Sequence, residues 1–171
     1  AIDLGLSVKW ADRNLGANSP TDMGGLYAWA EIISKNKYTW GNYKYWVCSG
    51  KFGPFLENHF SKAIHSIDSE DDAITNRYGK PWRIPTAAEF QELINKCRWV
   101  KTSECGIHGF RIYGYNGNSI FLPTEGVEHY WSATRMKEPQ HAKVLDIHYS
   151  KVQLFYRARY YGFNLRGVCD K

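Results

Sequence analysis

The chain has 171 residues and a mildly basic composition, with a formal net charge of +5. This length predicts a single domain over residues 1–171 with a hydrophobic core of its own. The basic residues are scattered, so we expect no nucleic-acid-binding stripe. No apolar run approaches the ~20 residues that a membrane-spanning helix needs, so no membrane span is expected. The chain starts at Ala1 without a visible export signal, which leaves open a signal or anchor that has been removed.

Residues 1–30 read as short strands separated by turns at Asn18-Ser19-Pro20 and Gly24-Gly25. Residues 36–80 lack a period and predict loops carried on a scaffold. The acidic run Asp68–Asp72 in that stretch is interpreted as a solvated loop or the approach to a strand. Calcium binding by this run is the alternative, because a hard cation needs several converging oxygens.

The next segment carries the strongest local signal for a helix. Thr86 and Glu89 stand at the spacing of a capping box, and Phe90, Leu93 and Cys97 follow at helical spacing. Strand-like pieces then cover residues 99–101, 109–115 and 119–122, and Asn116-Gly117 predicts a hairpin turn between the last two.

The C-terminal segment alternates as half-buried antiparallel strands do. We expect Leu145 and Ile147 to share one face, while residues 144, 146 and 148 share the other. Residues 151–155 and 162–168 alternate in the same way. Few helices and many short strands with long loops predict an α+β fold.

The four cysteines are Cys48, Cys97, Cys105 and Cys169, and none belongs to a CxxC pair. The missing pair argues against zinc and thioredoxin-type sites. Disulfides, with three possible pairings, and free buried thiols both stay open. No cofactor and no metal are expected, and the histidines show no metal-binding spacing.

Several strings resemble known proteins when they are taken together. Residues 82–90, WRIPTAAEF, resemble a signature of the formylglycine-generating-enzyme-like superfamily, a branch of the C-type lectin fold. DLGLSVKWADRNLGA, YAWAE, GNSIFLP, YWSAT and RYYGFNLRGV resemble a paralogous domain common in gut Bacteroidetes and related bacteria. The resemblance covers almost the whole chain and implies a C-type-lectin-like fold with a small twisted sheet core, one or two helices, long loops and termini that meet.

The chain also resembles the variable proteins of diversity-generating retroelements, which use this fold to present a hypervariable C-terminal surface. The resemblance implies that residues 130–168 form such a segment, with a framework at positions 142, 145, 147, 152, 159, 162, 163, 165 and 166. Around these framework positions lie the ten residues that we name below as ligand-binding, and mutation of adenines in an Asn codon can produce every one of them. It does not reach Lys143, Lys151 or Gln153. The expected ligand-binding residues are His141, Val144, Asp146, His148, Phe155, Tyr156, Arg157, Ala158, Tyr160 and Tyr161.

The residues themselves also favour binding over catalysis. Six aromatic or Arg residues from Phe155 to Tyr161 follow the point where strand alternation breaks, and such side chains dominate binding hot spots. The alternative is that these rings cover a sheet edge. Glu138-Pro139-Gln140 is similar to a sugar-binding tripeptide of calcium-dependent lectins, but the partner motif is missing, so we interpret it as a loop.

We therefore expect a ligand-binding display protein, and not an enzyme, whose partner is a protein or glycan on a cell surface. The expected location is extracellular, on the bacterial surface or on a phage virion. Two other hypotheses stay open: a fixed adhesin-type surface domain, and a divergent formylglycine-generating-type oxidase. The oxidase would need a reactive cysteine pair near its C-terminal end, whereas Cys169 stands alone in its region.

Overall fold

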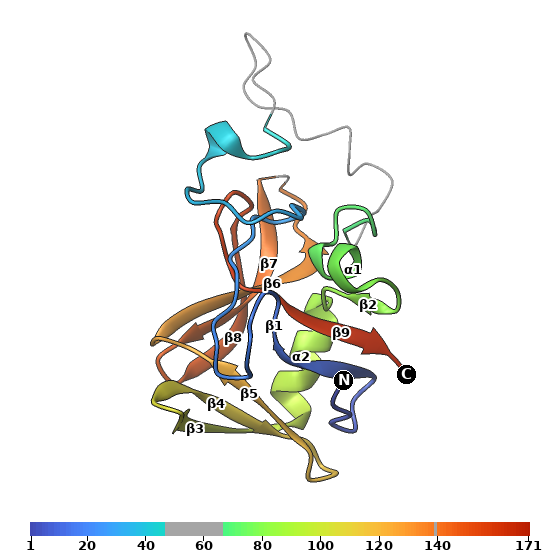
Figure 1. Ribbon diagram of the computed structural model, residues 1–171, viewed down its shortest axis with the longest axis vertical. Helices are drawn as coiled ribbons and strands as arrows, with labels where there is room; N and C mark the ends of the chain where they lie inside the picture. Colours follow the sequence, from blue (N-terminus) through green and yellow to red (C-terminus); the bar gives the residue numbers. More distant parts are fainter. Residues whose placement is uncertain (47–66, 139) are drawn as a thin grey trace.

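The computed structural model describes residues 1–46, 67–138 and 140–171 (Figure 1). Within these residues the fold is mixed α+β, with mostly antiparallel strands in three small sheets and two α-helices. The predicted α+β class is therefore confirmed. No helix of the described part is long and apolar enough to cross a membrane.

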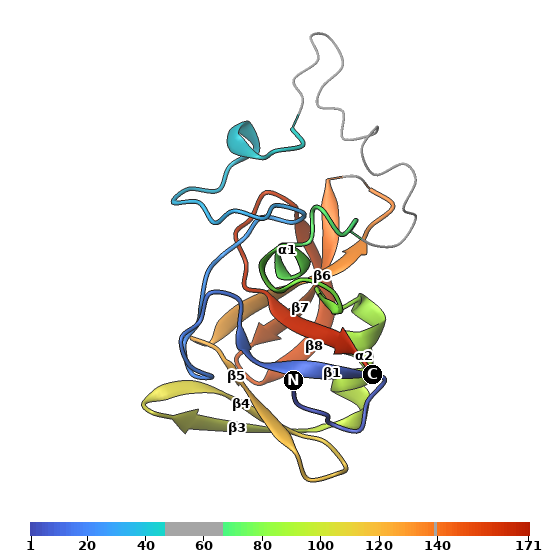
Figure 2. The same cartoon turned by 45° about the vertical axis from the view of Figure 1, so that its right-hand side comes forward.

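The first sheet joins the two ends of the chain. Strand β9 (Arg166–Asp170) lies between β1 (Val8–Asn14) and β2 (Trp82–Arg83) and is antiparallel to both. Lys171 Nζ lies 3.0 Å from Asp3 Oδ1, so the termini are close together, as Figure 2 also shows.

The second sheet is a meander of β3 (Arg98–Glu104), β4 (Ile107–Tyr113) and β5 (Ser119–Pro123). The predicted turn at Asn116-Gly117 is present between β4 and β5. Gly117 has φ +83°, in the left-handed region that glycine tolerates. The Asn116 side chain donates to the carbonyl of Asp3, which ties this turn to the N-terminal segment.

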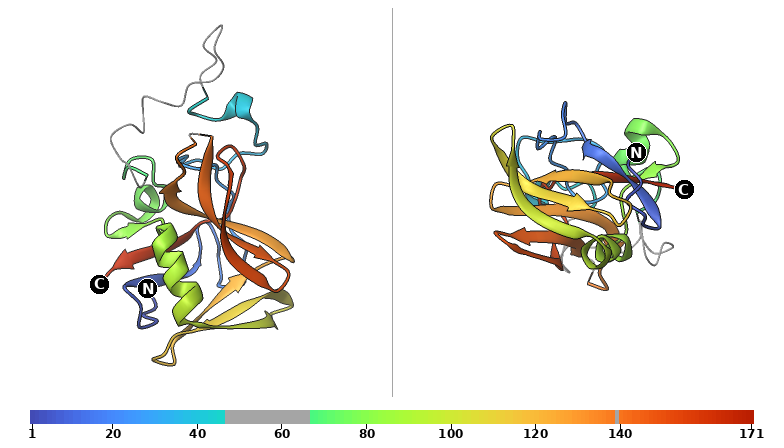
Figure 3. Two further views of the ribbon diagram at one scale, coloured as in Figure 1. Left: turned by 180° about the vertical axis from the view of Figure 1, so that it is seen from behind. Right: turned by 90° about the horizontal axis from the view of Figure 1, so that it is seen from below.

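The third sheet has the order β6-β7-β8 and is formed by Val127–Arg135, His141–His148 and Lys151–Ala158. Helix α2 (Ala87–Lys96) begins at the predicted capping box: Thr86 accepts from the Glu89 amide, and Glu89 accepts from the Thr86 amide. The buried face of α2, with Phe90 and Leu93, joins one side of this sheet in a common core (Figure 3).

Two hydrophobic clusters meet at β7, one on each side of it. Leu145 and Ile147 belong to the cluster that contains α2, whereas Ala142 and Val144 belong to the other. The predicted division of residues between two faces is confirmed. The prediction that β7 is half-buried is wrong, because a second cluster covers most of the other face, where His148 alone is exposed.

Three further expectations about local structure are corrected. Leu26–Glu31 is not a strand, and only Tyr27 forms an isolated bridge, with Phe163. Residues 162–165 precede β9, whose first four residues are all buried. Asp72 caps helix α1 (Ala73–Tyr78), so the acidic run leads into a helix and not a strand.

Candidate functional site

The register of the sheet β6-β7-β8 decides which predicted site residues lie together. Directly opposed residues share a face. Opposed pairs place His129, Asp146 and Gln153 in one row across the three strands. Val144, Phe155 and Arg157 share their face, which we call the upper face of the sheet. The lower face packs on α2 through Leu145 and Ile147.

The ten predicted ligand-binding residues are split between these surfaces. The upper-face group is Val144, Asp146, His148, Phe155 and Arg157, and the lower-face group is His141, Tyr156 and Ala158. Tyr160 and Tyr161 follow the end of β8. Val144 has no exposed surface, because the cluster above β7 covers it. Asp146 is also buried, and its partner Arg157 is partly exposed.

A polar network surrounds the Asp146 carboxylate. Gln153 Nε2 donates to Asp146 Oδ2 at 2.9 Å, and Arg157 Nη2 donates to Asp146 Oδ1 at 3.1 Å. His129 Nε2 also lies 2.9 Å from Asp146 Oδ1. Two donor side chains, Gln153 and Arg157, therefore compensate the desolvation of one buried carboxylate, as burial of a charge requires.

Arg157 is held at every nitrogen of its guanidinium group. Its Nε donates to His129 Nε2 at 3.1 Å, and its Nη1 donates to the carbonyl of Tyr156 at 3.0 Å. The same group lies over the Phe155 ring, 4.7 Å from its centre. Arg157 consequently fixes the side chains around it and has little capacity left to bind a ligand's carboxylate or phosphate.

His129 completes this network and was not expected from the sequence. Its Nε2 can accept from Arg157 when unprotonated or donate to Asp146 when protonated, but not both. Burial lowers the pKa of His129, and the Arg157 charge lowers it further, while Asp146 opposes the change. The neutral ring is therefore favoured near pH 7. The alternation of His129 with Trp131 on one strand is the signal that could have placed it beside Asp146.

Two adjacent rings of β8 form the most exposed aromatic feature of the sheet. Phe155 and Tyr156 stack with ring centres 4.7 Å apart, and 42% and 45% of their surfaces are exposed. His141 meets the other side of the pair, with its ring centre 5.4 Å from that of Tyr156. We call Phe155 and Tyr156 the aromatic ridge. Consecutive strand residues ordinarily point to opposite faces, so the stacking indicates that both rings lean toward the margin of β8.

A second line of rings connects the N-terminal loops to the same sheet, and we call it the ring row. Its contacts have ring centres 4.3–5.7 Å apart. Its members, in spatial order, are Trp46, Trp40, Tyr160, Tyr161 and Phe163, and Phe163 stacks on His129. Trp40 and Trp46 were missed because their segment has no sequence period. Most of these rings pack against the core, and Tyr161 is the most exposed member, with 42% of its surface accessible.

The other candidate sites have structural partners. Asp72 accepts from the amides of Ile74, Thr75 and Ile84, and Asp71 pairs with Lys44. In the described residues no cluster of His, Cys, Asp or Glu could hold a metal ion. Pro139 of the tripeptide at 138–140 lies outside the described residues.

The cysteines lie in separate elements. Cys97 follows helix α2, Cys105 lies in the β3–β4 turn, and Cys169 lies in β9, and all three are free thiols. Cys48 lies outside the described residues, so its pairing stays open.

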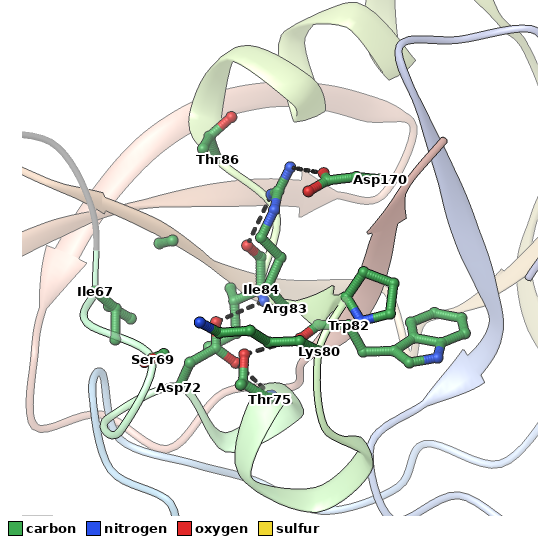
Figure 4. Close-up of a pocket in the computed structure, with 12 residues that line it drawn as sticks. Ile67, Ser69, Asp72, Thr75, Lys80, Trp82, Arg83, Ile84, Thr86 and Asp170 are labelled. Carbon is green, nitrogen blue, oxygen red and sulfur yellow. Dashed lines mark hydrogen bonds and ion pairs between the residues drawn. The ribbon is translucent and has the colours of Figure 1, made fainter.

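A cavity of about 350 Å³ lies on another side of the molecule, between α1, β2 and the start of α2 (Figure 4). Two of its polar lining side chains bind neighbouring groups: Thr75 Oγ1 donates to the carbonyl of Trp82, and Arg83 pairs with Glu89 and Asp170. These bonds join α1, β2, α2 and β9, so we interpret the cavity as part of the scaffold.

No family model, curated protein or solved structure matches this chain. The geometry of the site consists of exposed aromatic rings supported by a polar network whose members bind one another.

Proposed function

We propose that this chain is a ligand-binding domain of the C-type-lectin-like fold, which presents the margin of the sheet β6-β7-β8 to a macromolecular ligand at a cell surface. The observation that carries the proposal is the aromatic ridge, which is exposed while Arg157 beneath it is fixed by three acceptors. Exposed rings supply large contact area, and a fixed support reduces the entropy lost on binding.

The sharper form of this proposal is a variable protein of a diversity-generating retroelement, from a bacterium or its phage. It rests on the sequence resemblance. It is supported by the burial of framework residues such as Ala142, Leu145 and Leu165 beside exposed Tyr156 and Tyr161. Val144 departs from the pattern, since a buried position can vary only among residues that fit the core.

The gene's neighbourhood tests this sharper form. We expect a reverse transcriptase gene and a near-identical repeat that differs from the codons for residues 141–161 mainly at adenines. A neighbourhood that lacks both features removes the retroelement proposal and leaves a fixed binding or adhesin-type domain.

The binding function is tested by selection and substitution. A ligand is first selected for the purified chain from a glycan array and from a displayed library of cell-surface proteins. Replacing Phe155 and Tyr156 together by Ala should weaken its binding by ~2 kcal/mol or more, about 30-fold. The matched control replaces Tyr78 and Tyr115, which are also exposed but lie on other elements. Equal affinities for the two double variants would contradict the proposal.

We propose binding in preference to oxidase chemistry, which requires a reactive cysteine pair. Cys97, Cys105 and Cys169 lie on three separate elements, and burial raises the pKa of Cys97, which disfavours its reactive thiolate. Titration of accessible thiols in the folded chain, together with Cu(I) binding, checks this preference. Tight Cu(I) binding by two thiols would favour the enzyme.

A further inference from the structure

Strand β8 is an open edge of its sheet. Among the described residues it is hydrogen-bonded only to β7, at one side, and no other strand lies along its second side (Figure 3). Alternate residues of such a strand direct their backbone N–H and C=O groups away from the neighbour. The Tyr156 carbonyl accepts from Arg157 Nη1, which indicates that Tyr156 is one of these outward residues.

The pairing along this edge is regular. The β7–β8 register runs over eight consecutive pairs without a shift, whereas β1–β9 and β6–β7 each contain one. Strand β8 contains no proline, and no bulge interrupts its pairing. Bulges and prolines are common means of blocking strand addition at an edge, so this edge stays geometrically able to accept another strand.

The charges around the edge select the chemistry of that strand. Lys151 and Arg157 lie on β8, which carries no acidic residue, and Lys143 lies on the adjacent β7. Asp146 is paired with Arg157, so Lys143 and Lys151 remain as the surplus charges. Two β8 strands paired antiparallel about Leu154 would place Lys151 opposite Arg157, and directly opposed like charges are destabilising. A second copy of this chain is therefore disfavoured.

We infer that the β8 edge accepts an extended segment of a protein ligand whose side chains carry carboxylates. This inference rests on the proposed binding function and specifies its ligand class. Backbone hydrogen bonds to the outward residues of β8 supply affinity. Carboxylates on the upper face, opposite Lys151, set the register, and the aromatic ridge packs against the added strand. The incoming strand takes over the bond that Arg157 now makes to the Tyr156 carbonyl.

The test uses a synthetic peptide that alternates Glu with Val and Thr. Amide hydrogen exchange and NMR shifts of the β8 residues report where it binds. We expect protection of β8 amides, and a dissociation constant about fivefold lower than that of the same peptide with Lys in place of Glu. The acidic peptide methylated on alternate backbone nitrogens, which cannot pair with the edge, should not bind.

Two variants of Tyr156 distinguish the contribution of its backbone N–H to peptide binding from that of its ring. Tyr156→Pro removes one outward N–H and should abolish peptide binding, whereas Tyr156→Ala keeps that N–H and loses only the ring contact, so it should weaken peptide binding without abolishing it. If the Pro variant fails to fold, the methylated peptide alone decides. Binding of the methylated peptide, or absence of β8 protection with the acidic one, overturns the inference. The binding function survives that failure if a selected ligand still depends on Phe155 and Tyr156, and it falls separately if no such ligand exists.

Discussion

At the scale of single residues, the site is ordered by groups that do not face solvent. Asp146 is buried, yet it fixes Arg157, and Arg157 lies against the exposed ring of Phe155. A ligand would contact the ring, while Asp146 stays buried behind it. The position of the exposed Phe155 ring therefore depends on the several hydrogen bonds that the planar guanidinium group of Arg157 makes at once.

Replacing Arg157 by Lys should destabilise the folded chain by ~1–2 kcal/mol. One ammonium cannot reach His129, Asp146 and the Tyr156 carbonyl together, and hydrogen bonds to charged groups are only partly screened at this half-exposed position. Urea unfolding measures the change. Arg77→Lys on the exposed side of α1 is the control and should stay within ~0.5 kcal/mol of wild type. A similar loss in both variants would refute the role assigned to Arg157.

Glu128 gives the fold a pH dependence of its own. Burial raises the pKa of Glu128 from 4.5 to about 7, and nearby Glu125 adds to the effect. The folded chain thus retains a proton that the unfolded chain releases. The associated stability is complete below the unfolded pKa and is lost as pH rises through about 7.

The Glu128→Gln variant should remove this dependence. Between pH 5 and pH 8 the wild type should lose ~1–2 kcal/mol more unfolding free energy than the variant, after allowance for partial exposure. Comparing the two proteins by urea unfolding at both pH values cancels the opposite trend from His129, whose pKa is lowered. Parallel pH profiles would show that Glu128 is ionised in the folded chain.

At the scale of elements, the sequence predicts structure best where residues close together in the chain determine that structure. Helix α2 begins at its capping box and buries Phe90 and Leu93, the residues that its period marked. Its C-terminal neighbour Cys97 continues that period in the sequence but lies at the helix cap with extended backbone angles.

The Thr86→Ala variant tests how much the capping box contributes. Loss of the hydroxyl leaves the Glu89 amide without its acceptor, and such caps stabilise a protein by ~1 kcal/mol. Thr86→Ser retains the hydroxyl and serves as the control. Thermal unfolding should give the order wild type, Ser variant, Ala variant, and an Ala variant as stable as the Ser variant would exclude a contribution from the cap.

Elements that depend on distant partners are harder to predict. The alternation in β7 correctly divided its residues between two faces, but it could not show that clusters cover both. That burial depends on Trp29, which lies far away in the sequence, and on Trp131 of the neighbouring strand. The same limit explains Val144 and also His129, whose partners Asp146 and Arg157 come from two other strands.

At the scale of the whole molecule, the termini and the candidate site lie on opposite sides. Strands β1 and β9 bring both ends together on one side, and β8 lies on the other in each view of Figures 1 and 3. A neighbouring domain joined at either end would therefore leave the aromatic ridge uncovered. This placement suits a domain that presents one margin of a sheet to a partner.

The closeness of the termini predicts that the chain tolerates circular permutation. Joining residue 171 to residue 1 by a short Gly/Ser linker and opening the exposed turn at Cys105-Gly106 should give a chain that unfolds cooperatively. Its stability should fall by only ~1–3 kcal/mol, because the opened turn contributes no core contact. Opening β7 between Val144 and Leu145 is the matched control and should prevent folding, since both residues are fully buried. Circular dichroism during urea unfolding distinguishes the two permutants. If the permutant opened at Cys105-Gly106 also fails to fold, there are two explanations: the ends are not adjacent in solution, or the β3–β4 hairpin must form locally before the sheets assemble. A third permutant with the same linker, opened at Tyr115-Asn116, keeps that hairpin intact and distinguishes the two.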